Sequence, residues 1–435
     1  MPNAASDSQA GDYRLFDSAV GSHLLVVPHS RIFALDPKFA DALRAGDPAA
    51  QTEVRDLAVS LEGEEPLDIV PATTPQSISL NVSPTCNLGC GYCYADRGGF
   101  AGTQASTMTW ETAKAAVDRL FALADHKVPI TVGFIGGEPF LNRKLIHRVV
   151  DYCWDLGRKS GQAVRFAVTT NGTLIGRGDI PMLRAYPFAV TISIDGGPEI
   201  QNRQRPSRSG RSSFVALRDA VTPLVEMPGM AKIAARATVV RSDLQIASRF
   251  DEIIGLGFRE AGFAPVRKGS SQYALKGADW EIYLEAITGL ARRELAAGLS
   301  GKPIRLTNFA IALKQLHRGF SMPYPCGAGG GYFSVAADGT WYACHRAIGQ
   351  ETYRLGSNEG LDAVRRTSFL HARHVHQQPE CSSCWARYLC SGGCHQEASA
   401  RSDSSCGFIR GWLDFCLAAY TEMMAHRPGW FTNNN

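Results

Sequence analysis

The sequence predicts an α/β protein built around a partial (β/α)6 barrel of the TIM type, with a small α+β domain before it and a cysteine-rich domain after it. Strand-like and helix-like segments alternate between residues 78 and 266, which implies right-handed crossovers and a parallel sheet. Three short strand-like runs precede this region, and eight of the 12 cysteines lie beyond residue 325. We therefore expect four parts, over residues 1–70, 71–275 (the barrel), 276–320 (a helical linker) and 321–435.

The first domain is predicted from the runs YRLF, HLLVV and RIFAL, which lie between residues 13 and 35. A helix should follow, because Asp36 is a good N-cap and Pro37 fits the first helical position. The small sheet would have an open edge. It is either a packing appendage or a module that pairs the leader segment of a peptide by strand addition. Residues 47–76 are rich in Ala, Glu and Pro and predict a connector.

Six strand-like segments are expected in the barrel: SISLNV, TVGFI, RFAVTT, AVTISI, AARATVV and FREAGFAPV. Helices are expected over 109–125, opened by Thr109, and over 141–157. In a barrel of this kind, catalytic groups lie at the carboxyl ends of the strands. Beyond the barrel, two helices are expected over 278–318 and a last amphipathic helix over 412–424.

Charge and composition exclude some classes of partner. Lys and Arg exceed Asp and Glu by 45 − 41 = 4, so no strong electrostatic argument for nucleic acid or for a membrane surface exists. No run of about 18 apolar residues occurs, and the first eleven residues lack the blocks of a signal peptide. We expect a cytoplasmic protein. In that compartment, 12 cysteines indicate metal ligation or catalysis in preference to disulfides.

The first cysteine group, Cys86, Cys90 and Cys93, has the spacing CxxxCxxC and follows the strand SISLNV directly. Three thiolates on one loop can hold three irons of a four-iron cluster and leave the fourth iron open. A zinc site is the alternative, but a structural zinc site needs four ligands, and no fourth Cys or His lies close in sequence.

This motif after the first barrel strand resembles the signature of the radical S-adenosylmethionine (SAM) superfamily. The resemblance implies that the open iron is chelated by the amino and carboxylate groups of SAM and that Tyr92 packs near the adenine. It also implies that an electron from a flavodoxin- or ferredoxin-type reductant cleaves SAM to a 5′-deoxyadenosyl radical. In this reading Cys86, Cys90 and Cys93 are the catalytic centre.

Further positions that match the family follow in order at the expected strand ends. Singly, each is a weak signal, because paired glycines commonly mark turns. The resemblance implies contacts with SAM for the following residues: Gly136, Gly137 and Glu138 at its amino group, Asn171, Ser193 and Asp195 at its ribose, and Arg236 at its carboxylate.

The second cysteine array resembles the SPASM domain, which binds two auxiliary four-iron clusters in that family. With the first cluster, three four-iron clusters are implied. The ligands carried over are Cys326, Cys344 and Cys394 for the first auxiliary cluster, and Cys381, Cys384, Cys390 and Cys406 for the second. A pair of zinc knuckles built from the CxxC pairs is the competing interpretation.

Some SPASM enzymes have another cysteine shortly after the first, but the segment GAGGGYF after Cys326 has none. This leaves room for an open iron that could bind a substrate thiolate. Cys416 is either the missing ligand or a buried thiol on the last helix. Cys153 is expected in the core.

His345 bears on the reaction. Anaerobic sulfatase-maturating enzymes typically have Asp directly after the cysteine that corresponds to Cys344, and here that residue is His345. The runs CHRAIG and CGFIRGWLDFC instead resemble the maturases of the quinohemoprotein amine dehydrogenase small subunit, which join Cys sulfur to side-chain carbons of Asp or Glu. His345 is then a proton acceptor or a support for the cluster ligand beside it.

The function expected is therefore that of a peptide or small-protein maturase that forms thioether crosslinks. The substrate would carry a leader segment. Carbon–carbon crosslinking of a peptide and formylglycine formation in a sulfatase are the enzymatic alternatives. A zinc-binding interaction protein is the non-enzyme alternative.

Overall fold

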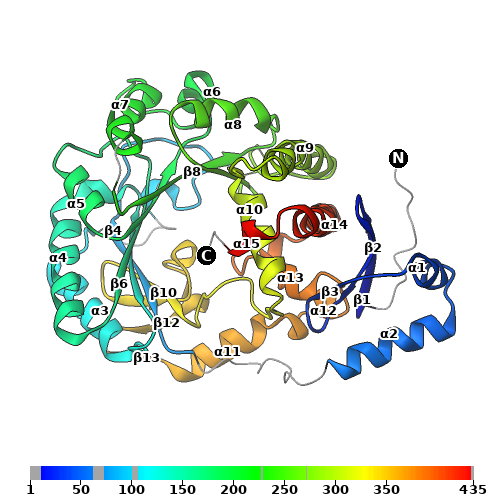
Figure 1. Cartoon of the computed structure of the whole chain (residues 1–435). Helices are drawn as coiled ribbons and strands as arrows, with labels where there is room; N and C mark the ends of the chain where they lie inside the picture. The colour runs from blue at the N-terminus through cyan, green and yellow to red at the C-terminus, as the bar shows by residue number, and fades with distance from the viewer. Residues whose placement is uncertain (1–10, 62–72, 100–105, 227–228, 271, 433–435) are drawn as a thin grey trace. The chain divides into compact units, whose positions relative to one another are not determined.

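The computed structural model describes residues 11–61, 73–99, 106–226, 229–270 and 272–432. The chain divides into two compact units. Figure 1 shows the chain coloured from blue at the N-terminus to red at the C-terminus, with helices and strands labelled as in the text. The barrel unit comprises Ala72–Asp279 and Gly327–Leu370, and the terminal unit comprises Met1–Pro71, Trp280–Cys326 and His371–Asn435. The four-part division expected along the chain stays a prediction.

Six consecutive parallel strands form the centre of the barrel unit, which confirms the α/β fold and the parallel sheet. The strands pair in chain order from the first to the last, so each crossover connects neighbours. Their bounds are β4 (Ser77–Ser83), β5 (Ile130–Gly136), β6 (Val164–Thr170), β7 (Phe188–Ser193), β8 (Lys232–Val239) and β9 (Ala261–Pro265).

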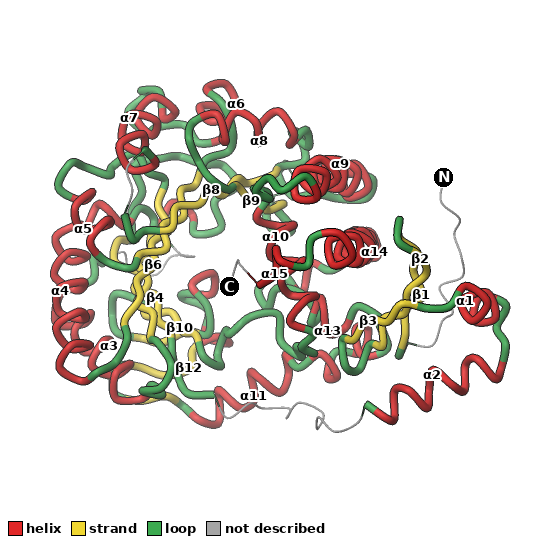
Figure 2. The backbone as a smooth tube through the Cα atoms, in the orientation of Figure 1, coloured by secondary structure: helices red, strands yellow, loops and turns green. Residues whose placement is uncertain are grey.

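Helices α3, α4, α5 and α7 lie on the outer side of the curved strands (Figure 2). Thr109 opens α3 as predicted, because its side chain accepts a hydrogen bond from Thr112 N at 3.2 Å. The crossover helices are α3 (Trp110–Leu123), α4 (Arg143–Ser160), α5 (Asp179–Ala185), α6 (Pro198–Gln204), α7 (Ser213–Val225) and α8 (Ile246–Gly255).

Four short strands from the cysteine-rich region extend the same sheet beyond β4. β10 (Tyr332–Val335) pairs with β4 in parallel, and Ser334 is the register partner of Ser79. β11 (Thr340–Tyr342), β12 (Arg354–Ser357) and β13 (Gly360–Leu361) then continue antiparallel. The segment that carries Cys344 therefore belongs to the sheet whose first barrel strand leads into the CxxxCxxC motif.

The terminal unit begins with the predicted antiparallel sheet of β1 (Tyr13–Ser18), β2 (Gly21–Val26) and β3 (Arg31–Ala34). Asp36 caps α1 (Pro37–Arg44), as expected, by accepting from Lys38 N at 2.9 Å. Buried side chains that include Leu24 and Leu43 pack the sheet against this helix.

The connector expected over residues 47–76 is wrong in its first part, because residues 48–60 form helix α2 (Pro48–Ser60). Asp47 accepts hydrogen bonds from Ala49 N and Ala50 N, both at 2.9 Å. Pro48 then supplies the first helical position, where its missing N–H costs nothing. The Asp47 cap and the helix-forming alanines favour a helix over residues 48–60, although the prolines of the segment had suggested a connector. The part of the expected connector that covers 62–72 lies outside the described residues.

The two helices expected over 278–318 are present as α9 (Asp279–Leu299) and α10 (Thr307–Arg318). The last long helix, α14 (Asp403–His426), begins nine residues earlier than expected, because Ser402 and Ser405 form a capping box. The remaining helices are α11 (Ala363–Arg373), α12 (Pro379–Ser382), α13 (Arg387–Cys390) and α15 (Gly429–Thr432). Within the described ranges, no helix is long and apolar enough to span a bilayer.

Candidate functional site

The cluster loop, Cys86–Cys93, follows the carboxyl end of β4 directly. Two donors hold the first sulfur: Leu88 N lies 3.4 Å from Cys86 Sγ, and Asn171 Nδ2 lies 3.6 Å from it. A side chain on Gly91 would collide with the hydroxyl of Tyr273. Such N–H···S contacts favour thiolates over thiols, so the loop is folded in a way that suits metal-bound sulfur.

Cys90 is buried close to the other two sulfurs of the cluster loop, whose negative charge adds to the effect of burial on the pKa of Cys90. Burial raises the pKa of Cys90 to about 11, and the Arg205 guanidinium counteracts that rise. Among the residues that the structure describes, no three His, Cys, Asp or Glu side chains form a group that could hold a metal ion. The fit to an iron–sulfur cluster therefore rests on the kind of donors, three cysteine sulfurs on one loop with N–H donors and a nearby cation, and not on the present positions of the sulfurs.

The two glycines after β5 turn the chain back against the end of β4. Gly136 has φ +152°, and a side chain there would collide with Ser83 O. Gly137 N donates to the same oxygen at 2.9 Å. Asn81 Oδ1 lies close to Gly136, and it is buried with no hydrogen-bond partner in the described part of the chain. The end of β4 therefore presents a free acceptor beside the glycine pair.

Glu138 is fully buried, and its carboxylate is engaged by protein donors. Oε1 accepts from Thr170 Oγ1 at 2.7 Å and from Phe140 N at 3.1 Å, and Oε2 accepts from Asn171 N at 2.8 Å. Burial raises the pKa of this carboxyl, and these donors oppose the rise. Glu138 thus ties the end of β5 to the end of β6. Its contact with the SAM amino group stays a prediction.

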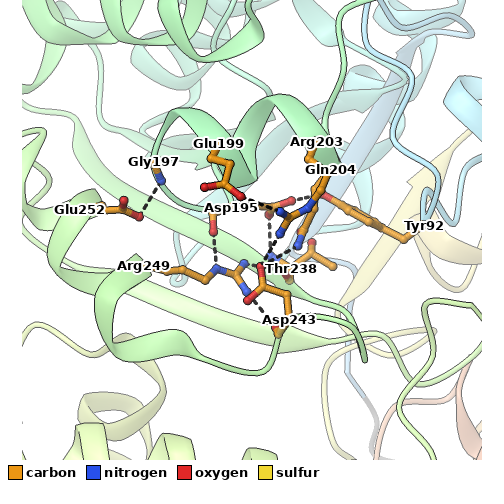
Figure 3. A network of polar contacts seen from close by, with 10 residues as sticks. All are labelled: Tyr92, Asp195, Gly197, Glu199, Arg203, Gln204, Thr238, Asp243, Arg249 and Glu252. Carbon is orange, nitrogen blue, oxygen red and sulfur yellow. Dashed lines mark hydrogen bonds and ion pairs between the residues drawn. The ribbon is translucent and has the colours of Figure 1, made fainter.

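Asp195 is also fully buried and lies at the centre of a polar network (Figure 3). Tyr92 donates its hydroxyl to Oδ2, and Thr238 N donates to Oδ1 at 2.8 Å. Arg205 contacts both carboxylate oxygens at 3.1 Å, and its guanidinium lies 5.4 Å from the centre of the Tyr92 ring. Asp195 therefore fixes the cluster loop to β7 and β8. Its predicted contact with the ribose is not tested.

A buried arginine stabilises this network through main-chain oxygens. Arg249 donates to the main-chain oxygens of Asp195, Thr238 (2.7 Å) and Asp243 (3.3 Å). Figure 3 shows its guanidinium between these segments. One side chain therefore holds together the three chain segments around the ends of β7 and β8.

The remaining predicted SAM contacts occupy neighbouring strand ends. Ser193 on β7 is the register partner of Arg236 on β8, so their side chains lie on the same face of the sheet. Asn171 donates from Nδ2 to Asn87 Oδ1 at 2.9 Å and so contacts the cluster loop itself. The structure thus brings these residues to the same edge of the barrel as the cysteines, while their SAM contacts stay predictions.

His345 is held inside the barrel unit by a chain of hydroxyl groups. Tyr332 OH lies 2.9 Å from His345 Nδ1 and 2.7 Å from Ser79 Oγ on β4. The ring of Tyr94, the residue after Cys93, meets the His345 ring edge-on with centroids 5.9 Å apart. Burial lowers the pKa of His345 to about 4, with a smaller effect from Arg346. The imidazole that faces Tyr94 is therefore neutral at physiological pH.

Three of the four ligands predicted for the second auxiliary cluster are close in the terminal unit. Burial raises the pKa of Cys381, and Arg401 opposes the rise, with its Nη1 donating to the Cys381 sulfur at 2.8 Å. The nearby Cys406 and Cys384 add to the rise. The fourth, Cys390, ends α13. The role of these cysteines as ligands stays a prediction.

The other predicted ligands are divided between the units. Cys326 and Cys394 belong to the terminal unit and Cys344 to the barrel unit, so their grouping stays a prediction. Cys416 is fully buried on α14, and burial alone raises its pKa well above the usual range. Its role as a ligand stays a prediction as well. Cys153 is fully buried on α4, as expected of a core thiol.

Sequence reasoning missed several residues of this site. Arg205 follows α6 in the run NRQRP, which carries no recognisable motif. Tyr332 and Asn81 look like ordinary strand residues. Tyr94 had a signal, because an aromatic residue directly after the third cysteine of the motif must lie beside the cluster loop.

The comparisons with known proteins agree with this geometry. Residues 80–225 match the family model of the radical SAM superfamily. An uncharacterized protein of Methanocaldococcus jannaschii is 39% identical to this chain over 134 residues. The matched part is 31% of this chain and 43% of that protein's length. The serine-type anaerobic sulfatase-maturating enzyme of Klebsiella aerogenes is 24% identical over 77% of this chain and 83% of its own.

Two solved structures share the fold. The enzyme anSMEcpe with bound AdoMet has a TM-score of 0.67 at 20% identity and covers 82% of this chain and 97% of its own. SuiB of Streptococcus suis, bound to its precursor peptide SuiA, has a TM-score of 0.52 at 14% identity and covers 91% and 97%. The family match lies over the strand and loop that carry Cys86, Cys90 and Cys93, and the donors around these sulfurs suit a SAM-binding iron–sulfur cluster, so residues 80–225 belong to a radical SAM domain.

Proposed function

We propose that this enzyme modifies a peptide or small protein by joining a Cys sulfur to a side-chain carbon of Asp or Glu as a thioether. The observation that carries the proposal is the contact between His345 and Tyr94, since it links the residue after Cys344 to the residue after Cys93. Peptides are bound in two structures of similar fold, anSMEcpe with the Cp18Cys peptide and SuiB with SuiA. These neighbours support a peptide substrate.

Cys86, Cys90 and Cys93 would hold the SAM-binding cluster, and the two cysteine sets of the C-terminal region would hold two auxiliary four-iron clusters. When bound, SAM and its cluster supply a 5′-deoxyadenosyl radical that can remove hydrogen from an unactivated carbon. The protein holds the cofactor and the substrate in position. Asn81 Oδ1 is a free acceptor at the end of β4 and would receive a hydrogen bond from the bound cofactor.

His345 is the residue that we place against the substrate. Its Nδ1 is held by Tyr332, and Tyr332 is held by Ser79, so the imidazole has a fixed orientation. Arg346 lies over the face of Tyr94 with its guanidinium 5.2 Å from the ring centre. Tyr94 therefore contacts both His345 and Arg346. The Arg346 guanidinium would pair with an acidic side chain of the bound peptide.

The proposal is tested with anaerobically reconstituted enzyme, SAM, dithionite and peptides that contain Cys together with Asp or Glu. The expected products are 5′-deoxyadenosine and a peptide that has lost two hydrogen atoms and one alkylatable thiol, both measured by mass spectrometry. A product that loses two hydrogens but is still alkylated at cysteine would instead indicate a carbon–carbon crosslink and would refute thioether formation.

Formylglycine formation is the second candidate, because named sulfatase-maturating enzymes match 74–77% of this chain. It is tested with the same enzyme and a sulfatase-derived peptide with Ser or Cys at the target position. Conversion of that residue to an aldehyde, detected with a hydrazide reagent, would favour this reaction. The presence of His345 in place of the Asp typical of those enzymes argues for the thioether.

We also propose that the N-terminal sheet binds the leader segment of the substrate. Among the described strands, β3 pairs with β2 alone, so its other edge can accept a strand. Addition of a leader-containing peptide should slow amide hydrogen exchange at Arg31–Ala34 by at least tenfold, and a leaderless peptide should not. Equal exchange with both peptides would place leader recognition elsewhere.

A further inference from the structure

Two surface segments of the barrel unit hold the cluster loop from outside, and both carry unpaired arginines. The first segment is residues 171–178 between β6 and α5, and the second is residues 205–212 between α6 and α7. Within these two segments, the family resemblance implies a role for Asn171 alone. Both are hydrogen-bonded to the loop carrying Cys86, Cys90 and Cys93.

The second segment contacts the cluster loop through main-chain atoms. Gly89 N donates to Pro206 O at 2.7 Å, and Arg208 N donates to Asn87 O at 3.0 Å. Leu88 and Ser207 form an isolated antiparallel bridge between these two bonds. The Arg208 guanidinium also reaches back to Cys86 O at 3.4 Å. This segment therefore contacts the residues that lie next to the predicted cluster ligands in the loop.

The first segment reaches the same loop from its other side. Asn87 Nδ2 donates to Thr173 Oγ1 at 2.8 Å, and Asn171 Nδ2 donates to Asn87 Oδ1 at 2.9 Å. Asn87 is thus contacted by both segments, once through its side chain and once through its carbonyl. Its neighbour in sequence, Cys86, is a predicted iron ligand.

Arg177, Arg208 and Arg211, which we call the arginine patch, are exposed. No acidic side chain within ion-pair distance of any of the three occurs in the described part of the chain. Some exposed arginines of this unit are neutralised, since Arg203 pairs with Glu199 at 3.1 Å and Arg218 pairs with Asp219 at 2.8 Å. The three arginines of the patch differ from other exposed arginines, such as Arg165, in lying on the two segments that contact the cluster loop. An unneutralised cationic patch favours the approach of an anionic protein over a neutral one.

We propose that the arginine patch is the docking surface for an acidic one-electron carrier protein that reduces the cluster. This inference rests on the proposed radical chemistry, because homolytic cleavage of SAM consumes one electron per event. The anionic hydroquinone of a flavodoxin would give up one electron and become the neutral semiquinone, with no proton released. The electron would enter at the site held by Cys86, Cys90 and Cys93.

The test compares two reductants in the wild type and in the variant Arg177→Glu/Arg211→Glu. Arg208 is kept, because its side chain bonds to the cluster loop. With reduced flavodoxin at low salt, the variant should form 5′-deoxyadenosine from SAM at least tenfold more slowly than the wild type, with a raised half-saturating flavodoxin concentration. Salt should slow the wild type and have little effect on the variant, since screening removes the attraction. With dithionite, both proteins should react at the same rate.

The control is Arg165→Glu, which makes one of these charge reversals at an exposed residue near the amino end of β6, the end of the strand opposite the loop that contacts Asn87. It should not alter the flavodoxin dependence. Equal flavodoxin dependence in the double variant and the wild type would overturn the docking proposal while leaving the proposed function intact. Absence of 5′-deoxyadenosine from dithionite-reduced wild type would overturn both.

Discussion

Cys90→Ala should remove about four irons per chain and reduce SAM cleavage to background, while the iron that we propose for the C-terminal cysteines remains. Cys90 lies in the middle of the cluster loop, and burial and Arg205 together set the pKa of its thiol. Loss of one of three ligands leaves a second iron uncovered, and such a cluster does not keep its composition. Iron content, the EPR spectrum of the reduced protein and 5′-deoxyadenosine release measure the effect.

The control is Cys153→Ala, which removes a thiol that is fully buried on α4 and far in sequence from the motif. This variant should keep its iron and its turnover and should lose about 1 kcal/mol or more of stability, as expected when a core side chain is truncated. Full iron and full turnover in Cys90→Ala would refute the assignment of the cluster loop. A wild-type protein that is colourless and contains zinc would favour the zinc-binding alternative.

The barrel could be predicted from sequence because its elements are encoded locally. Alternation of apolar and polar residues, the cap at Thr109 and the placement of each motif after a strand locate β4 to β9 within a few residues. The family resemblance then assigned Cys86, Cys90 and Cys93, whose spacing in one loop is itself a local property. The helix α2 was missed because a single cap, Asp47, decided between helix and connector.

The tertiary partners of the site could not be predicted in the same way. β10 pairs with β4 across about 250 residues of chain, and no local pattern encodes such a pairing. The role of Arg205 is shown by its contact with Asp195, and that of Tyr332 by its contact with His345; neither contact follows from the sequence. The sequence therefore located the residues that contact cofactors in the family, while the side chains that hold them in place required the structure.

Arg205 and Asp195 should shift the reduction potential of the cluster in opposite directions when each is neutralised. Arg205 lies over Tyr92 and acts electrostatically on Cys90, and Asp195 opposes it with the other sign. Reduction adds negative charge, so Arg205→Gln should make the potential more negative and Asp195→Asn should make it more positive. A unit charge about 8 Å away at an effective dielectric of about 20 contributes roughly 2 kcal/mol, or about 90 mV for one electron.

Each single variant also leaves one buried charge without its partner, which should lower the free energy of unfolding by about 3–5 kcal/mol. The double variant Asp195→Asn/Arg205→Gln removes both charges, so its potential should return close to that of the wild type and its stability should be higher than that of either single variant. Tyr92→Phe breaks the hydrogen bond to Asp195 without changing a charge and serves as the control for loop position. EPR-monitored redox titration shows whether the network tunes the cluster through its charges or only holds the cluster loop in position. If Arg205→Gln and Asp195→Asn moved the potential in the same direction, the network would act by holding the loop and its charges would not tune the cluster.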